Sequence, residues 1–350
     1  MTVFACVRCG AVLTAPVSQV ALPVQARQIY GHDLLPALME PGTYAVEPEP
    51  SGPPWRLWSE VGAEEAEARG VYAPVHSLSY GPPGAIVVAP GDVRGTVLIL
   101  EHCDGYCMGL DGRDGPNLAC VQCGQAVATR IDDCSLWQAV WLAPQAVRRL
   151  AGNGPARPVV SWEMLHAEPL ETPPVEPSGA WSPVWAAAVG AALARLLAAS
   201  AGTPVAVPDG PVAETFRRVL DTLLPPGRSA KNVVLAGPGL SAHGAGIALV
   251  PQHPQTGEVW PVSGRAHVVP LAAEVWMHLA FHHDRLPVPT SGGIPDGVWR
   301  DDPPPMLPSW PFRPDWRVFL YTLARLPEVR QPWLRRIYDQ VKDRPYAPPF

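Results

Sequence analysis

The sequence predicts an α+β protein in two parts, from the placement of its cysteines, its prolines and its helical periodicity. All seven cysteines lie at or before position 134, among short β-branched runs that Pro-Gly and Gly-Asp turns separate. Five prolines crowd Glu168–Pro183, and apolar residues at helical spacing follow that stretch. We therefore expect a β-rich domain over 1–155, a Pro-rich linker over 156–180 and a mixed, helix-containing α/β domain over 181–350.

Within the first part, two β-branched runs predict strands and one acidic run predicts a helix. Ala85–Val88 and Thr96–Leu100 are the strand candidates. Ala63–Arg69 is rich in glutamate and alanine, and Gly70 follows it, as is typical of a short helix with a glycine at its end.

In the second part, three apolar stripes at helical spacing predict three helices. Their start signals are Asp209-Gly210-Pro211, a capping Asp315, and Pro332 in a first helical turn. The stripes are Phe216, Val219, Leu220 and Leu223; Phe319, Leu320, Leu323 and Leu326; and Leu334, Ile337, Tyr338 and Val341. Asn232–Ala236 and Gly246–Val250 predict strands. Pro287–Pro314 holds nine prolines and predicts a long loop, pinned to the surface by Trp299, Trp310 and Phe312.

Composition and charge restrict the class of protein. Hydrophobic residues make up 47% and charged residues 17%, which indicates a folded chain, and 45 prolines predict long irregular connections. A net charge of −6 argues against a general nucleic-acid or anionic-membrane binder. The N-terminus has no basic region before an apolar run, and the alanine-rich Trp181–Ser200 carries Arg195. We expect no signal peptide, no membrane span and a cytoplasmic location.

Two copies of one short motif point to a metal site. Cys6-Val-Arg-Cys9-Gly10 and Cys120-Val-Gln-Cys123-Gly124 each precede a β-type run. Two residues between cysteines let both thiolates bind one ion, and the following glycine lets the backbone turn its amides toward the sulfurs. Two such knuckles predict a structural Zn²⁺ held by Cys6, Cys9, Cys120 and Cys123. The β-rich domain would then be zinc-ribbon-like, with a large insertion between its knuckles.

A second pairing of the cysteines stays open. Cys103 and Cys107 have the spacing of a compact four-cysteine finger with Cys120 and Cys123. That pairing leaves three cysteines for a second site, completed by a histidine. These residues are Cys6, Cys9 and Cys134, with His32, His76 or His102. Outside any site, Cys134 is expected to be a plain buried thiol, and Asp132-Asp133 to face water or accept hydrogen bonds from zinc-loop amides.

Two further patterns suggest other functions. Glu274, His278 and His282 recur every fourth residue on an expected helix over Leu271–His283, as a metal or acid–base site would require. A polar helix face near a C-terminus is the competing interpretation. Residues 313–344 hold eight basic and four acidic side chains, which suggests a phosphate-facing surface on the C-terminal helices.

The chain resembles a family of uncharacterised actinobacterial proteins. The resemblance rests on three segments: FACVRCGAVLTAPVSQVALP, GPNLACVQCGQAVATRIDDCSLWQAVWL and LPEVRQPWLRRIYDQV. It implies a cytoplasmic bacterial protein and no particular activity. The leading hypothesis is a non-enzymatic, zinc-stabilised interaction or scaffold protein with a protein partner. The alternatives are an enzyme with a site around Glu274, His278 and His282, and a nucleic-acid-binding protein acting through the C-terminal helices.

Overall fold

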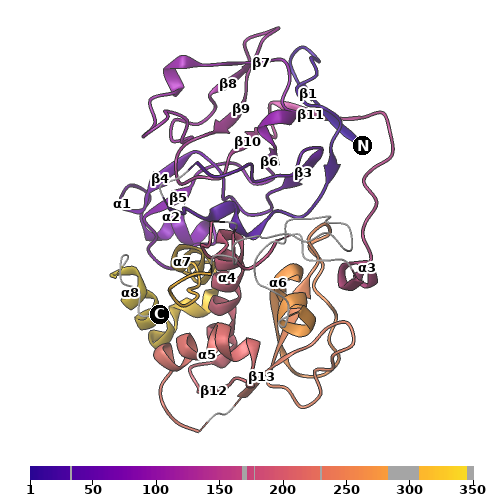
Figure 1. Cartoon of the computed structure of the whole chain (residues 1–350). Coiled ribbons are helices and arrows are strands. Elements are labelled where there is room, and N and C mark those ends of the chain that lie inside the picture. The colour runs from indigo at the N-terminus through magenta and orange to yellow at the C-terminus, as the bar shows by residue number, and fades with distance from the viewer. Residues whose placement is uncertain (32–33, 168–171, 177, 229–230, 283–306, 345–350) are drawn as a thin grey trace. The chain divides into compact units, whose positions relative to one another are not determined.

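The chain folds into a mixed α+β structure with several sheets, as the sequence predicts (Figure 1). The computed structural model describes residues 1–31, 34–167, 172–176, 178–228, 231–282 and 307–344. Its contacts divide the chain into two units. The first unit comprises residues 1–160 with 254–257 and 324–330, and the second unit holds the rest.

Short strands are the main regular structure of the first unit. They are β1 (Thr2–Cys6), β2 (Ser18–Gln19), β3 (Thr43–Val46), β4 (Trp55–Leu57), β5 (Ser77–Ser79), β6 (Ile86–Val88), β7 (Thr96–Leu98), β8 (Leu118–Cys120), β9 (Ala126–Ile131), β10 (Ala139–Leu142) and β11 (Val147–Ala151). Its helical pieces are η1 (Val24–Arg27), α1 (Trp58–Val61), α2 (Ala63–Ala68), η2 (Pro90–Asp92), η3 (Leu100–His102) and η5 (Pro327–Arg330). The expected strands at 85–88 and 96–100 and the expected helix at 63–69 are confirmed as β6, β7 and α2.

One seven-stranded sheet organises this unit, in the order β2-β3-β6-β10-β9-β8-β7. All of its pairs are antiparallel except β2 with β3. Strand β1 pairs antiparallel with β11 along its whole length, and β4 pairs with β5. The β1–β11 pair and the seven-stranded sheet share one core, because Phe4 of β1 packs edge-on against Tyr44 of β3 at 5.1 Å between ring centroids. Cys6 and Cys120 are buried in the same core.

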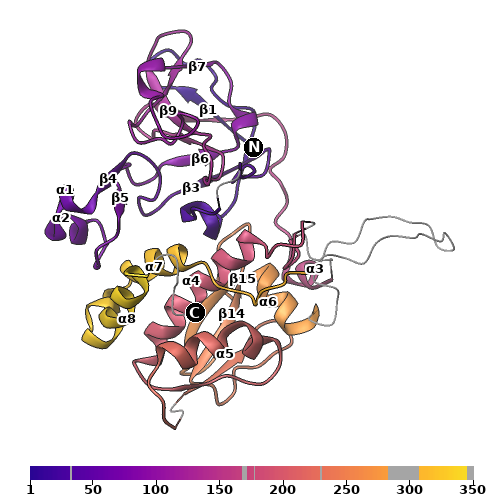
Figure 2. The ribbon, with the colours of Figure 1, turned by 60° about the vertical axis from the view of Figure 1, so that its left-hand side comes forward.

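The second unit is built on a four-stranded parallel sheet, in the order β12-β13-β14-β15. Figure 2 shows its strands β14 and β15. Its strands are β12 (Val205–Ala206), β13 (Lys231–Leu235), β14 (Ile247–Gln252) and β15 (His267–Ala272). Its helices are α3 (Trp162–Ala167), α4 (Pro183–Ser200), α5 (Pro211–Leu223), α6 (Ala273–Met277), the π-helical segment η4 (His278–His282), α7 (Trp316–Ala324) and α8 (Pro332–Lys342). Helix α4 packs against β14 and β15.

The three helices expected from apolar stripes are confirmed as α5, α7 and α8. Every stripe residue within them is buried, and only Leu326 lies beyond its helix, since α7 ends at Ala324. Asp315 caps α7 as expected, because its Oδ1 accepts the N–H of Val318 at 2.8 Å. The expected strands at 232–236 and 246–250 are confirmed as β13 and β14.

The expected helix over Leu271–His283 is wrong at its start and in its regularity. Leu271 and Ala272 belong to β15, so the helix begins at Ala273. From His278 onward it continues as a π-helical turn, where hydrogen bonds span five residues instead of four. Side chains four residues apart therefore no longer stack along one face across this segment.

Two proline-rich stretches fall partly outside the described residues. In the expected linker, residues 168–171 and 177 lie outside the described residues. The described part of the linker contains helix α3. In the expected loop Pro287–Pro314, residues 287–306, which include Trp299, lie outside the described residues. At its described end, the Trp310 carbonyl accepts the indole N–H of Trp181 at 2.9 Å, and Phe312 packs edge-on against the same indole.

Helix α4 has the length and apolarity of a membrane span, and 72% of it is buried inside the protein. The surrounding elements account for that burial. The ammonium of Lys231 donates to the carbonyl of Ala199 near its C-terminus, and the N–H of Asp315 donates to the carbonyl of Ala186. In this structure α4 is the central helix of the second unit's core.

Gly190 lets the chain before α7 lie directly on α4. A Cβ at this position would come within 2.5 Å of the carbonyl oxygen of Asp315. Alanine is favoured over glycine in a helix by about 1 kcal/mol. We expect Gly190→Ala to lower the free energy of unfolding nonetheless, by about 1–3 kcal/mol, because backbone atoms cannot move aside as a flexible side chain can. Urea unfolding followed by far-UV circular dichroism measures this, and a gain in stability would contradict it.

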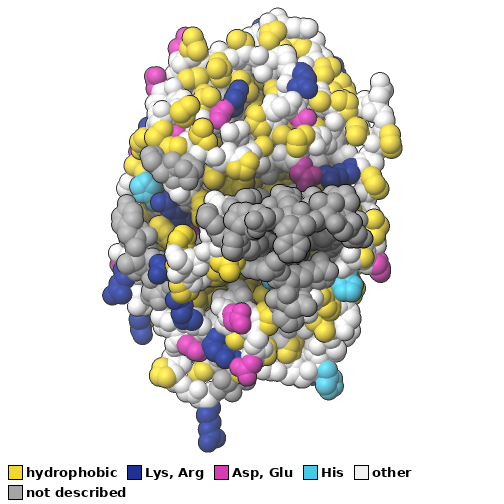
Figure 3. All heavy atoms as spheres, viewed as in Figure 1, with side chains coloured by type: hydrophobic (Ala, Val, Ile, Leu, Met, Phe, Trp, Pro, Cys, Tyr) yellow, Lys and Arg dark blue, Asp and Glu magenta, His cyan; other side chains and the backbone are white. Residues whose placement is uncertain are grey.

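The first unit also exposes several large apolar side chains near β7, near β8 and in the residues that follow β1. Hydrophobic side chains are spread over the upper part of Figure 3, the part in which Figure 1 places β7 and β8. We call the following six residues the knuckle surface: Val7, Val12, Val97, Leu98, Leu100 and Val121.

Candidate metal centre

The two CxxCG motifs fold into the same local structure. Cys6 ends β1 and Cys120 ends β8, and each opens a tight turn. In the first turn, Gly10 donates its N–H to the Cys6 carbonyl at 2.9 Å, and in the second, Gly124 donates to the Cys120 carbonyl at 2.9 Å. Both glycines have positive φ, +79° and +70°, a conformation that disfavours side chains. The motif itself therefore dictates the turn.

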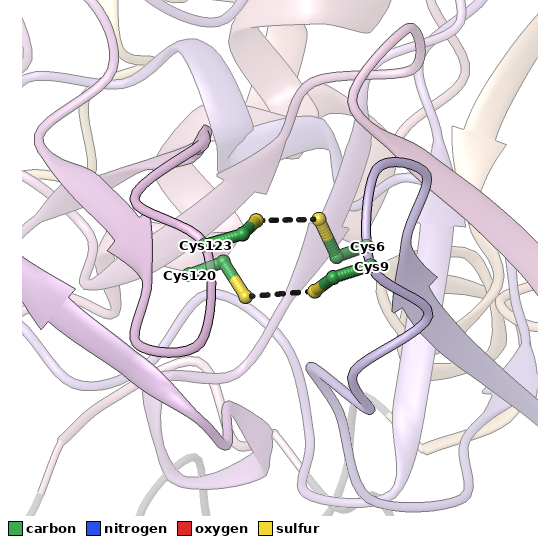
Figure 4. A group of neighbouring side chains, drawn as sticks. All are labelled: Cys6, Cys9, Cys120 and Cys123. Carbon is green, nitrogen blue, oxygen red and sulfur yellow. Dashed lines mark hydrogen bonds between the residues drawn. The ribbon is translucent and has the colours of Figure 1, made fainter.

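The four sulfurs of the motifs lie together, although 110 residues separate Cys9 from Cys120 (Figure 4). The Sγ atoms of Cys6 and Cys123 are 3.7 Å apart, and those of Cys9 and Cys120 are 3.6 Å apart. All four Sγ atoms lie within 4.8 Å of one another. A tetrahedral zinc ion with Zn–S bonds of 2.3 Å requires sulfurs about 3.8 Å apart. The arrangement therefore fits one tetrahedral metal ion such as zinc.

The electrostatics of the cluster also favour a cation. Burial opposes ionisation of Cys6, but N–H groups of Cys9 and Arg8 donate to its sulfur and lower the pKa of Cys6 to about 7. The N–H of Ala11 favours the Cys9 thiolate, yet burial and the three neighbouring sulfurs outweigh it and raise the pKa of Cys9 to about 12. The Cys6 thiolate thus forms readily, and a bound positive charge would favour the thiolate of Cys9.

Four thiolates would complete the coordination of such an ion. Cys6 and Cys120 are buried, Cys123 is half-buried, and Cys9 is exposed at the surface. With four sulfur ligands, zinc has no position for water or substrate, which is the arrangement of structural sites. A metal here would tie the end of β1 to the end of β8 and would not perform catalysis.

The alternative set with Cys103 and Cys107 is not brought together. The thiol of Cys103 donates to the carbonyl of Ile99 at 3.3 Å, and Cys103 belongs to no cluster of potential metal ligands among the described residues. Of the histidines considered, His102 contacts the Pro116 carbonyl through Nδ1 at 2.6 Å. Within the described part of the chain, neither His76 nor His102 joins a ligand cluster, and His32 lies outside the described residues.

Cys134 is not the plain buried thiol that the sequence suggests. It is half-buried and lies beside the exposed Cys107 and the buried Asp133, with one ligand atom from each within 4.8 Å of the others. The sequence analysis missed this cluster, since its members come from a loop and from the residues after β9. The Asp132-Asp133 pair was the available signal. Asp133 accepts hydrogen bonds from the amides of Met108 and Cys134, which lie outside the four-cysteine turns that the expectation concerned.

The structure places Glu274 and His278 in different surroundings. Glu274 is half-buried in the first turn of α6, whereas His278 is 8% exposed and packs edge-on against Trp185 at 5.0 Å between ring centroids. The side chain of His282 is outside the described residues. Of the side chains described, neither Glu274 nor His278 belongs to a cluster of potential metal ligands. An enzymatic role for this helix stays a prediction.

Several basic side chains of residues 313–344 have acidic neighbours. Arg335 and Lys342 both contact Asp339, at 3.0 and 3.9 Å, while Arg330 pairs with Glu67. Tyr338 is buried, which raises the pKa of its hydroxyl, so it does not stack on a ligand at the surface. Nucleic-acid binding through these helices stays a prediction that these ion pairs do not strengthen.

No family model, no curated protein and no solved structure matches this chain. The resemblance to actinobacterial proteins therefore stays a prediction from the quoted segments. The functional argument rests on the four-cysteine centre, the surface around it, and the physical chemistry of both.

Proposed function

We propose that the chain is a non-enzymatic, zinc-stabilised interaction or scaffold protein that binds a protein partner. In this proposal the two knuckles hold one structural zinc ion as a zinc-ribbon-like clasp, and residues 10–119 are the insertion between them. The closed set of four sulfurs supports a structural metal, because it leaves no coordination position for a substrate.

The observation that carries the proposal is the exposure of apolar side chains in and beside the two knuckles: Val7 and Val121 lie inside the CxxC motifs, and Val97 pairs with Ala119 next to Cys120. Their exposed fractions are 52% for Val7, 54% for Val97 and 57% for Val121. Hydrogen bonds hold the segments together: the N–H of Val121 donates to the Gly95 carbonyl at 3.0 Å, beside the start of β7. Apolar side chains grouped on a rigid support are typical of protein interaction sites. Zinc would supply that rigidity by fixing both turns.

Strand β7 suggests how the partner binds. It is the last strand of the seven-stranded sheet, so its outer edge has no strand partner among the described residues. An exposed strand edge can accept an extended segment of another chain through main-chain hydrogen bonds, with apolar side chains seated alongside. The partner in this proposal is a protein that adds an extended apolar segment to β7, next to Val97 and Leu98.

The state of the cysteines supports a cytoplasmic location. Four of the seven sulfurs form a cluster that suits a metal ion, which requires thiolates. Reducing compartments keep cysteines as thiols that can bind zinc, whereas the cysteines of exported proteins are commonly oxidised to disulfides. A cytoplasmic site of action is therefore part of the proposal.

Site-specific photo-crosslinking in cells tests this function. A benzophenone amino acid at Val97 should give a discrete adduct with a second protein, because Val97 lies in the contact surface. The same residue at Val159, which is 64% exposed in the same unit but outside the knuckle surface, is the matched control. Adding Cys120→Ser to the Val97 variant should reduce the adduct at least tenfold, because the metal no longer fixes the surface.

Two outcomes would overturn the proposal. One is equal crosslinking from Val97 and Val159, which would mean that no site is concentrated around the knuckles. The other is an adduct at Val97 that persists unchanged after Cys120→Ser has abolished metal binding, as measured by elemental analysis. The second outcome would separate the partner's contact surface from the zinc centre.

A further inference from the structure

A second group of metal-ligating side chains lies apart from the four-cysteine centre. Cys107 belongs to the loop between η3 and β8, and Asp133 and Cys134 directly follow β9. We call these three residues the Cys₂Asp cluster. One potential ligand atom from each lies within 4.8 Å of the other two. A tetrahedral zinc ion with sulfur and oxygen ligands holds such atoms about 3.6–3.8 Å apart, so a small movement of the loop would bring them to bonding positions.

The carboxylate of Asp133 is held in place by backbone amides, and the described residues supply no counter-charge to it. Its side chain is 2% exposed. Oδ2 accepts the N–H of Met108 at 3.1 Å, and Oδ1 accepts the N–H of Cys134 at 2.7 Å. No Lys, Arg or His among the described residues forms an ion pair with it. A buried carboxylate is costly without a cation, and each oxygen keeps a lone pair that can bind one.

The charges around the cluster also favour a cation. Residues 101–134 hold six acidic and two basic side chains. Both basic side chains are already paired, Arg113 with Asp111 at 2.6 Å and Arg130 with Asp132 at 2.5 Å. Within residues 101–134, neither arginine is therefore left unpaired to balance the negative charge of the cluster.

The loop that carries Cys107 is folded tightly. The N–H of Gly105 donates to the Gly109 carbonyl at 3.2 Å. Gly109 has φ +80°, and a Cβ there would come within 2.3 Å of the Cys103 carbonyl oxygen. Only glycine permits this approach, so the loop presents Cys107 to Asp133 and Cys134 before any ion binds.

We propose that Cys107, Asp133 and Cys134 form a second metal site, which binds Zn²⁺ through three protein ligands and leaves its fourth position open. Two thiolates and one carboxylate suit zinc better than the hard cations calcium and magnesium, which prefer oxygen alone. Cys107 is exposed, so the fourth position faces solvent and takes water or a small anionic ligand. Zinc at this site exchanges faster than zinc at the closed four-cysteine centre.

Metal stoichiometry of the full-length, reduced protein tests this site. After saturation with Zn²⁺ and desalting, elemental analysis should find two zinc ions per chain in the wild type. Cys107→Ser and Cys134→Ser should each reduce this to one. Cys103→Ser is the matched control, because Cys103 lies in the same segment outside the cluster, and it should keep two. A brief exposure to chelator should remove one zinc from the wild type and none from Cys107→Ser.

Other outcomes overturn the proposal. One is a wild type that binds a single zinc ion, with no change on Cys107→Ser or Cys134→Ser. Another is a Cys107–Cys134 disulfide, seen as five instead of seven reactive thiols in denatured protein purified without reductant. Cys107 is exposed, so its replacement should not disturb folding, and far-UV circular dichroism verifies this for each variant. Cobalt(II) offers an independent readout, since thiolate-to-cobalt absorption from the second site should vanish in Cys107→Ser.

Discussion

In the proposed zinc-bound protein, removing the ion from the four-cysteine centre is expected to unfold the first unit and to leave the second unit folded. The centre joins β1 to the end of β8, across 110 intervening residues. Structural zinc contributes about 10–16 kcal/mol of folding free energy in zinc-finger peptides. Whole domains are stable by about 5–15 kcal/mol. Without the ion, packing in the shared core and weak S–H···S contacts, such as that between Cys6 and Cys123, remain between the two turns, and no strong bond joins their sulfurs.

Hydrogen exchange with and without a strong chelator, under reducing conditions, measures this effect unit by unit. Peptides covering β1, β8 and β11 should lose their protection, while those covering β13, β14 and β15 should keep it. Cys9→Ser should reproduce the effect without chelator, and Cys103→Ser should not. Unchanged protection of β1 in protein shown by elemental analysis to be zinc-free would refute the expectation.

The four-cysteine centre could be predicted because its information is local and repeated. Each motif carries two ligands and the glycine that was expected to let the backbone turn, and Gly10 and Gly124 adopt positive φ in those turns. The long separation between motifs would have argued for the nearer Cys103 and Cys107. The similarity of the two motifs predicted the pairing better than their separation did, because the fold places the end of β8 beside the end of β1 despite the long chain between them.

Features that depend on tertiary packing were harder to predict. Helices α5 and α8 carry complete apolar stripes, and the sequence predicts both. Leu271, by contrast, suits either a helix or a buried strand, and pairing with β14 decides for the strand despite the neighbouring Pro270. No sequence motif marks the Cys₂Asp cluster, because a folded loop brings Cys107 to the residues after β9.

The second large effect is expected from Trp276→Ala in the core of the second unit. Trp276 is fully buried, and its indole N–H donates to the carbonyl of Leu249 in β14 at 2.9 Å. Its ring also packs edge-on against Phe281. Truncating a buried tryptophan leaves a cavity and costs about 3–5 kcal/mol. Urea unfolding, monitored by hydrogen exchange in β13–β15, should show this loss of stability. The zinc content of the variant should equal that of the wild type.

Gly237 provides a second variant that tests the same packing. A Cβ at Gly237 would lie 2.5 Å from the Trp276 ring, so Gly237→Ala should destabilise the wild type. In the Trp276→Ala background the methyl group that Gly237→Ala adds enters the cavity. The destabilisation caused by Gly237→Ala should therefore become smaller or change sign. Contacting residues typically couple by about 0.5–3 kcal/mol in such cycles. Strictly additive effects would show that the ring does not lie against Gly237, and would remove the packing reason for the loss expected from Trp276→Ala.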